Sequence, residues 1–203
     1  WEDYALVDAT LPALESVGGK VDLFECDLLA TASFPALASL GAYELHECDA
    51  MTDLGHFPGV TALTGGLVAK WNDRLASAEG FPALGSAGTV ELSSDPQLAS
   101  LAGLSSLATA GEVTLRELDV LTVLDLPALD AVGRLAVTSN PSLADPGLPA
   151  LSSISTEAAF AGNTALSQCA IEALLDRVAP PTALCSENLD DGCSTWCTAD
   201  TGP

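Results

Sequence analysis

The sequence predicts an all-β fold, a right-handed parallel β-solenoid of about seven coils of 22–24 residues each. The first observation is an opening phrase, Leu or Phe usually followed by Pro, that recurs at this period. The phrase begins at Leu11, Phe34, Phe57, Phe81, Leu104, Leu126 and Leu148. The second observation is that each coil has a later half with apolar residues at alternate positions. A period this short and constant is typical of a solenoid, in which every repeat forms one coil, so we expect the three Phe openings to stack.

The first half of each coil repeats its apolar residues at every third position, as in Leu11, Leu14 and Val17. This spacing favours a short strand or an extended corner over a helix. Proline suits such a segment because it has no N–H group to give to a sheet. A glycine then precedes the second half of most coils, for example Gly88 and Gly111, and we expect it to permit a tight corner.

The second half of each coil alternates apolar with other residues, as in Val90 and Leu92, which predicts a strand buried on one face. A Cys, Asn or Asp follows in most coils, and an apolar residue comes three positions later. Stacked coils place equivalent residues roughly 4.8 Å apart. We therefore expect Asn72, Asn140 and Asn163 to hydrogen-bond the backbone of their own coil and of a neighbouring coil.

The complete phrase, clearest from Leu126 to Leu143, resembles the repeat of the receptor L-domain family. Those domains are leucine-rich-like β-helical modules of growth-factor receptor ectodomains, and bacterial and fungal cell-surface proteins carry similar repeats. The resemblance covers about residues 3–170. It implies a solenoid fold and a recognition role outside the cell, although the residue pattern of a repeat specifies the fold far better than the function.

The composition argues against two classes of partner. The 203 residues include 28 acidic and six basic residues, for a net charge of −22. Nucleic acid and anionic membrane need clustered Lys and Arg, so we expect neither as a partner. No stretch approaches the ~18 apolar residues of a membrane span, and we expect no membrane insertion in this segment.

The cysteines predict an exported protein with a disulfide-bonded C-terminal end. Residues 1–170 form the expected solenoid, and residues 171–203 form a cap with a helix over about 170–178 and the start of a linker. Four cysteines crowd at this end of the chain, and we pair Cys169 with Cys193 and Cys185 with Cys197. Zinc binding is the rival interpretation, but the spacings are irregular and no histidine lies nearby. Disulfides place the chain outside the cell or on its surface.

Two further cysteines, Cys26 and Cys48, occupy the same position in adjacent coils. They are close enough in that arrangement to form a disulfide, but they could equally remain buried thiols that fill space as small apolar groups.

At the other end of the chain, we expect the cap helix to cover the open sheet edge of the last coil, as a solenoid cap must.

Outward-facing strand positions carry the candidate binding residues, because the other face of each strand is committed to the core. These residues are Phe24, Glu25, His46, Glu47, Lys70, Trp71, Glu91 and Arg116. A flat surface that mixes aromatic groups with charges of both signs is typical of a contact surface. The alternative is an ordinary solvated face, with Glu47–Lys70 and Glu91–Arg116 as cross-strand pairs.

Catalytic and metal-binding patterns are sparse. Some β-helices act on polysaccharides, and Asp22, Glu44 and His46 could form such an acid–base cluster. However, the chain has no nucleophile elbow, metal-ligand spacing or phosphate loop, and coils of constant length leave no loops to build a groove. We therefore expect no catalysis and no cofactor. Candidate calcium ligands are Glu187, Asp190 and Asp191, although their loop lacks the alternating acids of an EF-hand.

These observations predict a non-enzymatic extracellular or cell-surface protein that acts through protein–protein contact. It would serve as an assembly or filament subunit that joins copies of itself, or as an adhesive module; the alternative is a receptor-like module that recognises a glycan or a protein ligand. The chain begins partway through a coil, with Asp3 and Leu6 in repeat positions. We expect the edge of this first coil to be covered by an upstream segment or a neighbouring chain.

Overall fold

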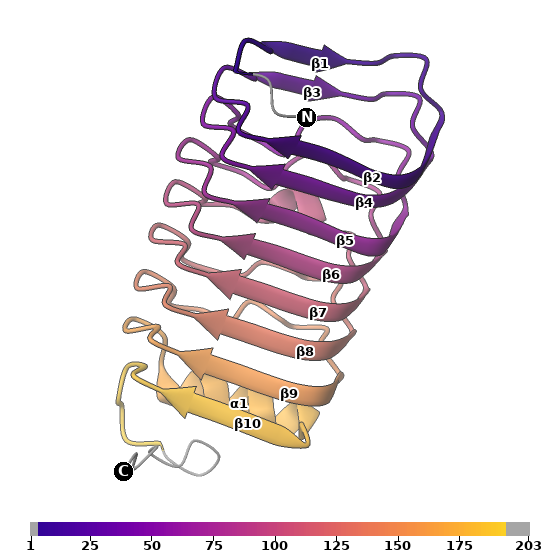
Figure 1. The fold of residues 1–203 in the computed structure, drawn as a ribbon. Coiled ribbons are helices and arrows are strands. Elements are labelled where there is room, and N and C mark those ends of the chain that lie inside the picture. Colours follow the sequence, from indigo (N-terminus) through magenta and orange to yellow (C-terminus); the bar gives the residue numbers. More distant parts are fainter. Residues whose placement is uncertain (1–3, 194–203) are drawn as a thin grey trace.

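A computed structural model of the chain describes residues 4–193 and forms a β-solenoid in which eight parallel strands stack into one long sheet (Figure 1). In chain order these strands are β2 (Ser16–Phe24), β4 (Ser39–His46), β5 (Ala62–Lys70), β6 (Ser86–Ser93), β7 (Thr109–Arg116), β8 (Ala131–Thr138), β9 (Ser153–Ala161) and β10 (Thr182–Ser186). Two short strands, β1 (Asp8–Thr10) and β3 (Thr31–Ser33), pair on another side of the first coils. A 3-10 turn, η1 (Ala102–Leu104), lies between β6 and β7.

The strands pair in the register that the sequence predicts. Leu45, Leu92 and Leu115 form part of one inward row and are fully buried. Glu44 and His46, on either side of Leu45, belong to outward rows. The alternation therefore confirms both the existence and the phase of the predicted strands.

Aromatic rings fill the first coils of the core. Phe34, Phe57 and Phe81 stack with centroid separations of 5.0 and 4.4 Å and nearly parallel planes, which confirms the expected column. Tyr43 packs edge-on against Phe57 at 4.8 Å. The hydroxyl of Tyr43 is buried and has no hydrogen-bond partner among the described residues.

A ladder of buried amides joins consecutive coils at the end of the main strands. The side-chain Nδ2 of Asn140 donates to the carbonyl of Leu115 (3.1 Å), and the backbone N–H of Asn140 donates to Oδ1 of Asn163 (3.1 Å). Asn72 and Asn163 bond in the same way. The predicted role of these asparagines is confirmed, because each side chain replaces hydrogen bonds that water would otherwise supply.

In β4 to β8, a glycine near the start of the main strand is required by close approach to the preceding coil. A Cβ atom at Gly88 would lie inside van der Waals contact with the carbonyl oxygen of Gly65, and one at Gly111 would meet the carbonyl of Gly88. Neither glycine has a positive φ. A bulkier residue would therefore be strained at these positions, as expected, but the reason is contact with the preceding coil and not an unusual backbone conformation. In the equivalent position of β9, the hydroxyl of Thr156 donates a hydrogen bond to such a carbonyl (2.7 Å).

The C-terminal helix, α1 (Gln168–Val178), extends the solenoid and does not close it. It begins at Ser167, whose Oγ accepts a hydrogen bond from Ala170 N (3.1 Å), and its apolar side chains join the core. β10 follows and pairs with β9, so α1 and β10 make an additional coil (Figure 1). The expectation that the helix covers the sheet edge is therefore wrong, because β10 forms that edge.

The disulfide between Cys169 and Cys193 forms as predicted. Cys185 is also disulfide-bonded, and its assigned partner, Cys197, lies outside the described residues. Cys26 and Cys48 are buried thiols that no disulfide joins, and they fill space in the core. Burial raises the pKa of Cys48 to about 12.

No helix within residues 4–193 has the length and apolar character needed to cross a lipid bilayer, since α1 has only 11 residues.

Candidate functional site

The structure divides the eight candidate residues between two surfaces. Phe24, His46, Lys70 and Arg116 belong to one outward row along the ends of the main strands, interrupted by Ser93. Glu91 lies two positions earlier than Ser93, on the same face of the sheet. The remaining three, Glu25, Glu47 and Trp71, come directly after their strands, where the chain turns a corner.

The corner residues share a left-handed backbone conformation. Every residue in this row has a positive φ, between 52° and 69°. Its members are Glu25, Glu47, Trp71, Ser94, Glu117, Ser139, Gly162 and Glu187. Their N–H groups continue the sheet ladder, as when Trp71 N donates to the carbonyl of Ser93 (3.2 Å). The turn therefore preserves hydrogen bonding and directs the side chains away from the flat face.

An aromatic run connects the two surfaces over the first three main strands. The rings of Phe24 and His46 lie 6.3 Å apart, and those of His46 and Trp71 are also 6.3 Å apart. The residue Trp71 is 50% exposed, while Phe24 and His46 are half-buried. The predicted exposure of Trp71 is confirmed, and this run is the part of the candidate set that the fold brings together.

Charged groups on the flat face mostly neutralise one another. Lys70 Nζ lies 2.7 Å from Glu91 Oε1, and Arg116 lies 3.5 Å from its neighbour Glu117. Both expected cross-strand pairs are therefore wrong. Glu47 is at the corner, away from the face that carries Lys70, and Glu91 is engaged by Lys70 instead of Arg116.

A hollow of about 550 Å³ lies beside Trp71. Its lining, which we name the Trp71 corner, consists of Asp27, Glu47, Asp49, Trp71 and Asp73. Four carboxylates and one indole thus border a space with no basic lining residue. The three aspartates directly follow the Cys or Asn that comes after each main strand (Cys26, Cys48 and Asn72), and this recurrence in consecutive coils is the sequence signal that could have found them. At physiological pH such a cluster carries a strong negative potential.

The acid–base cluster that an enzyme would need is engaged in ion pairs. Lys20 Nζ lies 2.9 Å from Asp22 Oδ2 and 2.7 Å from Glu44 Oε2. Glu44 Oε2 also lies 3.8 Å from His46 Nε2. Lys20 therefore holds both carboxylates on an open face.

The candidate calcium ligands do not converge. Asp190 Oδ1 accepts from Gly192 N (3.1 Å), while Asp191 accepts from the Ser167 hydroxyl and from Cys169 N (3.0 Å). Glu187 belongs to the corner row at the end of β10. The hydrogen bond from Ser167 holds the pKa of Asp191 below its ordinary value. These contacts tie the loop to the start of α1.

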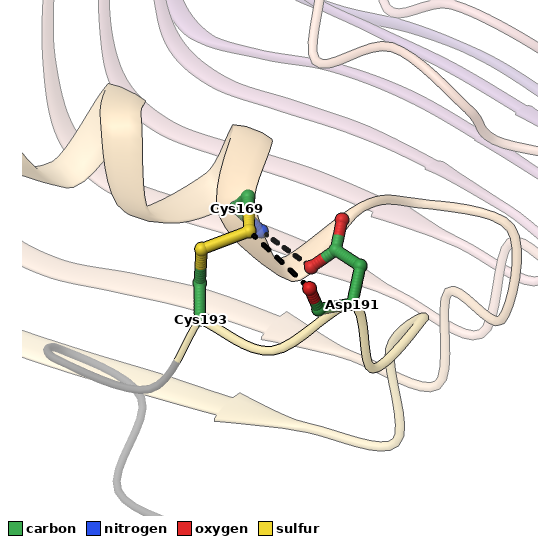
Figure 2. A group of neighbouring side chains, drawn as sticks. All are labelled: Cys169, Asp191 and Cys193. Atoms are coloured by element: carbon green, nitrogen blue, oxygen red, sulfur yellow. Dashed lines mark hydrogen bonds between the residues drawn. A yellow bond between two sulfur atoms is a disulfide. The ribbon is translucent and has the colours of Figure 1, made fainter.

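Within residues 4–193, the one cluster with three potential metal ligands is Cys169, Asp191 and Cys193 (Figure 2). Its two sulfur atoms are joined in the disulfide and cannot act as thiolate ligands. This cluster therefore fastens the C-terminal loop to α1.

Comparisons of this chain with known protein families, with curated proteins and with solved structures found no match.

Proposed function

We propose that this chain is a non-enzymatic extracellular or cell-surface protein that binds a basic segment of a protein partner at the Trp71 corner. The aromatic run on the adjoining strand ends extends the contact surface. This proposal makes the chain a recognition or adhesive module, in agreement with the resemblance to receptor L domains.

Trp71 is the observation that carries the proposal. A bulky side chain in the left-handed conformation costs roughly 1–2 kcal/mol, and half of this tryptophan is exposed to water. Ser and Gly fill the same position in other coils, so stacking does not require an indole there. An exposed aromatic residue with no evident structural role is typical of a binding hot spot.

The surrounding charges indicate the chemistry of the partner. An Arg or Lys side chain can lie over an indole face and gain about 0.5–2 kcal/mol, more when water is excluded. Beside Trp71, such a cation would also meet the carboxylates of Glu47, Asp49 and Asp73. The net charge of −22 would accelerate the approach of a basic partner over longer distances.

The disulfide between Cys169 and Cys193 supports the extracellular assignment, because such bonds persist in oxidising compartments. The ion-paired state of Asp22 and Glu44 supports a role in binding over a role in catalysis.

The test is binding of a labelled arginine–glycine repeat peptide, measured by fluorescence anisotropy, with a glutamate–glycine peptide of equal length as control. Trp71→Ala should weaken binding about tenfold, as expected for the loss of one cation–π contact and its packing. Ser139→Ala is the matched control, because Ser139 has the same corner position and conformation (φ 57°) in a later coil. It should bind like the unchanged protein.

Failure of the arginine–glycine peptide to bind, or equal affinity of Trp71→Ala, would rule out the Trp71 corner as a cation-binding surface. Binding of neutral oligosaccharides with loss on Trp71→Ala would instead favour the glycan-recognition alternative, in which the indole stacks on a sugar ring.

A further inference from the structure

A second hollow, which we name the β3 hollow, crosses four consecutive coils on the side of the solenoid that carries β1 and β3 (Figure 1). Its volume is about 600 Å³, and its lining comes from residues 30–33, 53–56, 79–82 and 102–103. It shares no lining residue with the Trp71 corner. Sites that bind small molecules have volumes of about 300–1,000 Å³, so the β3 hollow has the size of a ligand site.

An extra residue in three consecutive coils accounts for the β3 hollow. The stretch between the end of the main strand and the next opening phrase is one residue longer in 48–57, 72–81 and 95–104 than in 26–34 and 118–126. The three longer stretches contain most of the lining residues. The expectation that coils of constant length leave no groove is therefore wrong on this side of the solenoid.

Glycines form part of the lining and leave a backbone donor without a partner. Gly55 and Gly80 have φ values of 95° and 145°, which residues with a side chain rarely adopt. A Cβ atom at Gly80 would also lie 2.9 Å from the carbonyl oxygen of Gly55. Gly80 is buried, and its N–H group has no hydrogen-bond partner within residues 4–193. Because an unpaired buried donor costs free energy, a ligand with an acceptor oxygen would be stabilised there.

The carboxylates of the β3 hollow are not neutralised. Asp53 Oδ1 accepts a hydrogen bond from Gly55 N (2.9 Å), and the Glu79 side chain is exposed. No ion pair within residues 4–193 involves either carboxylate, whereas Lys20 and Lys70 neutralise acidic groups on the main sheet. No Lys or Arg lines the hollow. Asp53 and Glu79 are therefore available to a cationic ligand.

Uncharged polar groups complete the lining. Thr31 and Ser33 of β3 bring hydroxyl groups, and His56 brings an imidazole. Hydroxyl groups and a neutral imidazole each donate and accept hydrogen bonds, which suits the hydroxyl groups of a sugar. A linear polyamine would satisfy the carboxylates but has no acceptor for a free N–H group, and a neutral sugar would leave the carboxylates unpaired. The lining therefore fits a ligand that carries both ammonium groups and oxygen acceptors.

We propose that the β3 hollow binds a short oligosaccharide of amino sugars. The ammonium groups of the ligand pair with Asp53 and Glu79. Its hydroxyl and ring oxygens bond to the Gly80 N–H group and to the side chains of Ser33 and His56. The four coils that line the hollow span three strand spacings, or roughly 14 Å, so the ligand lies along the long axis of the molecule.

The test is isothermal titration calorimetry of the 203-residue chain with a β-1,4-linked glucosamine tetrasaccharide, at a slightly acidic pH that keeps the sugar amines protonated. One tetrasaccharide should bind per chain. Glu79→Gln and Asp53→Asn should each raise Kd about fivefold, as expected for the loss of one partly exposed ion pair. Asn at position 53 retains an oxygen that can accept from Gly55 N, so this change preserves the turn.

Two other ligands test the chemistry of recognition. The fully N-acetylated tetrasaccharide keeps the sugar oxygens but lacks the ammonium groups, and its Kd should be at least about tenfold larger. Spermine carries ammonium groups but no oxygen acceptor for the Gly80 N–H group, and its Kd should be at least about fivefold larger.

A matched variant separates the β3 hollow from general attraction to an acidic protein. Asp119→Asn removes one exposed carboxylate in a later coil, outside the hollow, and should leave Kd unchanged. An equal loss of affinity for Asp119→Asn and Glu79→Gln would show that the ligand responds to the net charge of −22, and the proposal would fail.

The proposal is also overturned if the glucosamine tetrasaccharide does not bind, or if Asp53→Asn and Glu79→Gln bind it like the unchanged protein. Equal affinity for the acetylated tetrasaccharide or for spermine would likewise rule out an amino-sugar site. This experiment shares no ligand and no variant with the arginine–glycine peptide experiment, so this inference and the proposed function stand or fall separately.

Discussion

Asp95 occupies a position in the amide ladder that an asparagine would satisfy better. It is fully buried, and its Oδ1 accepts hydrogen bonds from Asn72 N (2.8 Å) and Asn72 Nδ2 (3.0 Å). Its Oδ2 is buried and has no partner among the described residues. In a later coil the equivalent atom is Nδ2 of Asn140, which donates to the backbone carbonyl of Leu115. We predict that Asp95→Asn stabilises the protein at neutral and alkaline pH.

The magnitude follows from the pKa of Asp95. Burial raises this pKa from the ordinary 3.8 to about 6, although the hydrogen bonds from Asn72 oppose the shift. A difference of about 2 units corresponds to roughly 3 kcal/mol of destabilisation when the carboxylate is ionised. Because the folded state holds the proton more tightly than the unfolded state, this cost is fully present above a pH of about 6 and disappears as the pH falls below 3.8.

Urea unfolding followed by circular dichroism at about pH 8 and about pH 4 will measure this difference. Asp95→Asn should raise the free energy of unfolding by about 3 kcal/mol at the higher pH and by clearly less at the lower one. Asn140→Asp is the matched reverse change and should destabilise the protein most at the higher pH. A gain for Asp95→Asn that is absent at the higher pH, or equal at both pH values, would refute the reasoning.

Three other predictions concern stability. Gly88→Ala should lower the free energy of unfolding by about 2–4 kcal/mol, because its methyl group would overlap a carbonyl of the preceding coil. The matched change Gly19→Ala should cost less than about 1 kcal/mol, because a Cβ atom there would meet nothing within 4 Å. Equal effects of the two changes in urea unfolding would contradict this reasoning. Reduction of the Cys169–Cys193 disulfide, which spans a sequence separation of 24, should lower the free energy of unfolding by about 3 kcal/mol. An equal free energy of unfolding under oxidising and reducing conditions would show that the disulfide does not stabilise the fold. Trp71→Gly should relieve the left-handed conformation, so that the melting temperature stays level or rises by an amount equivalent to at most about 1 kcal/mol, while binding of the arginine–glycine peptide weakens about tenfold. A marked fall in melting temperature would mean that Trp71 supports the fold.

The sequence was sufficient to predict the strands and their phase, because one-sided burial imposes a period of two on every coil. The same regularity predicted the aromatic column at Phe34, Phe57 and Phe81 and the amide ladder at Asn140 and Asn163. Equivalent residues must stack in a solenoid, so finding the repeat also finds these contacts. The pairing of Cys169 with Cys193 could be expected because the helix lies between the last coil and the remaining cysteines.

The candidate site was predicted less well, because its geometry depends on backbone conformation that the residue types conceal. Glu25, Glu47 and Trp71 adopt a left-handed φ that is set by the stacking of corners, and only Gly162 in that row shows the usual sequence signal. The turn moves these side chains off the sheet face and changes which charges can pair. The last coil was missed for a similar reason, since a helix replaces its first half and removes the repeated opening phrase.

The corner row has a consequence for how an extended ligand would bind. Beside the corner row, Asp27, Asp49 and Asp73 follow one another in consecutive coils, at one strand spacing of roughly 4.8 Å along the long axis of the molecule. A flexible basic chain could shift by one coil and find nearly equivalent carboxylates, so these charges alone would hold it without fixing its position. Trp71 is the one tryptophan among the described corner residues, and it would therefore convert a sliding attachment into a single binding register.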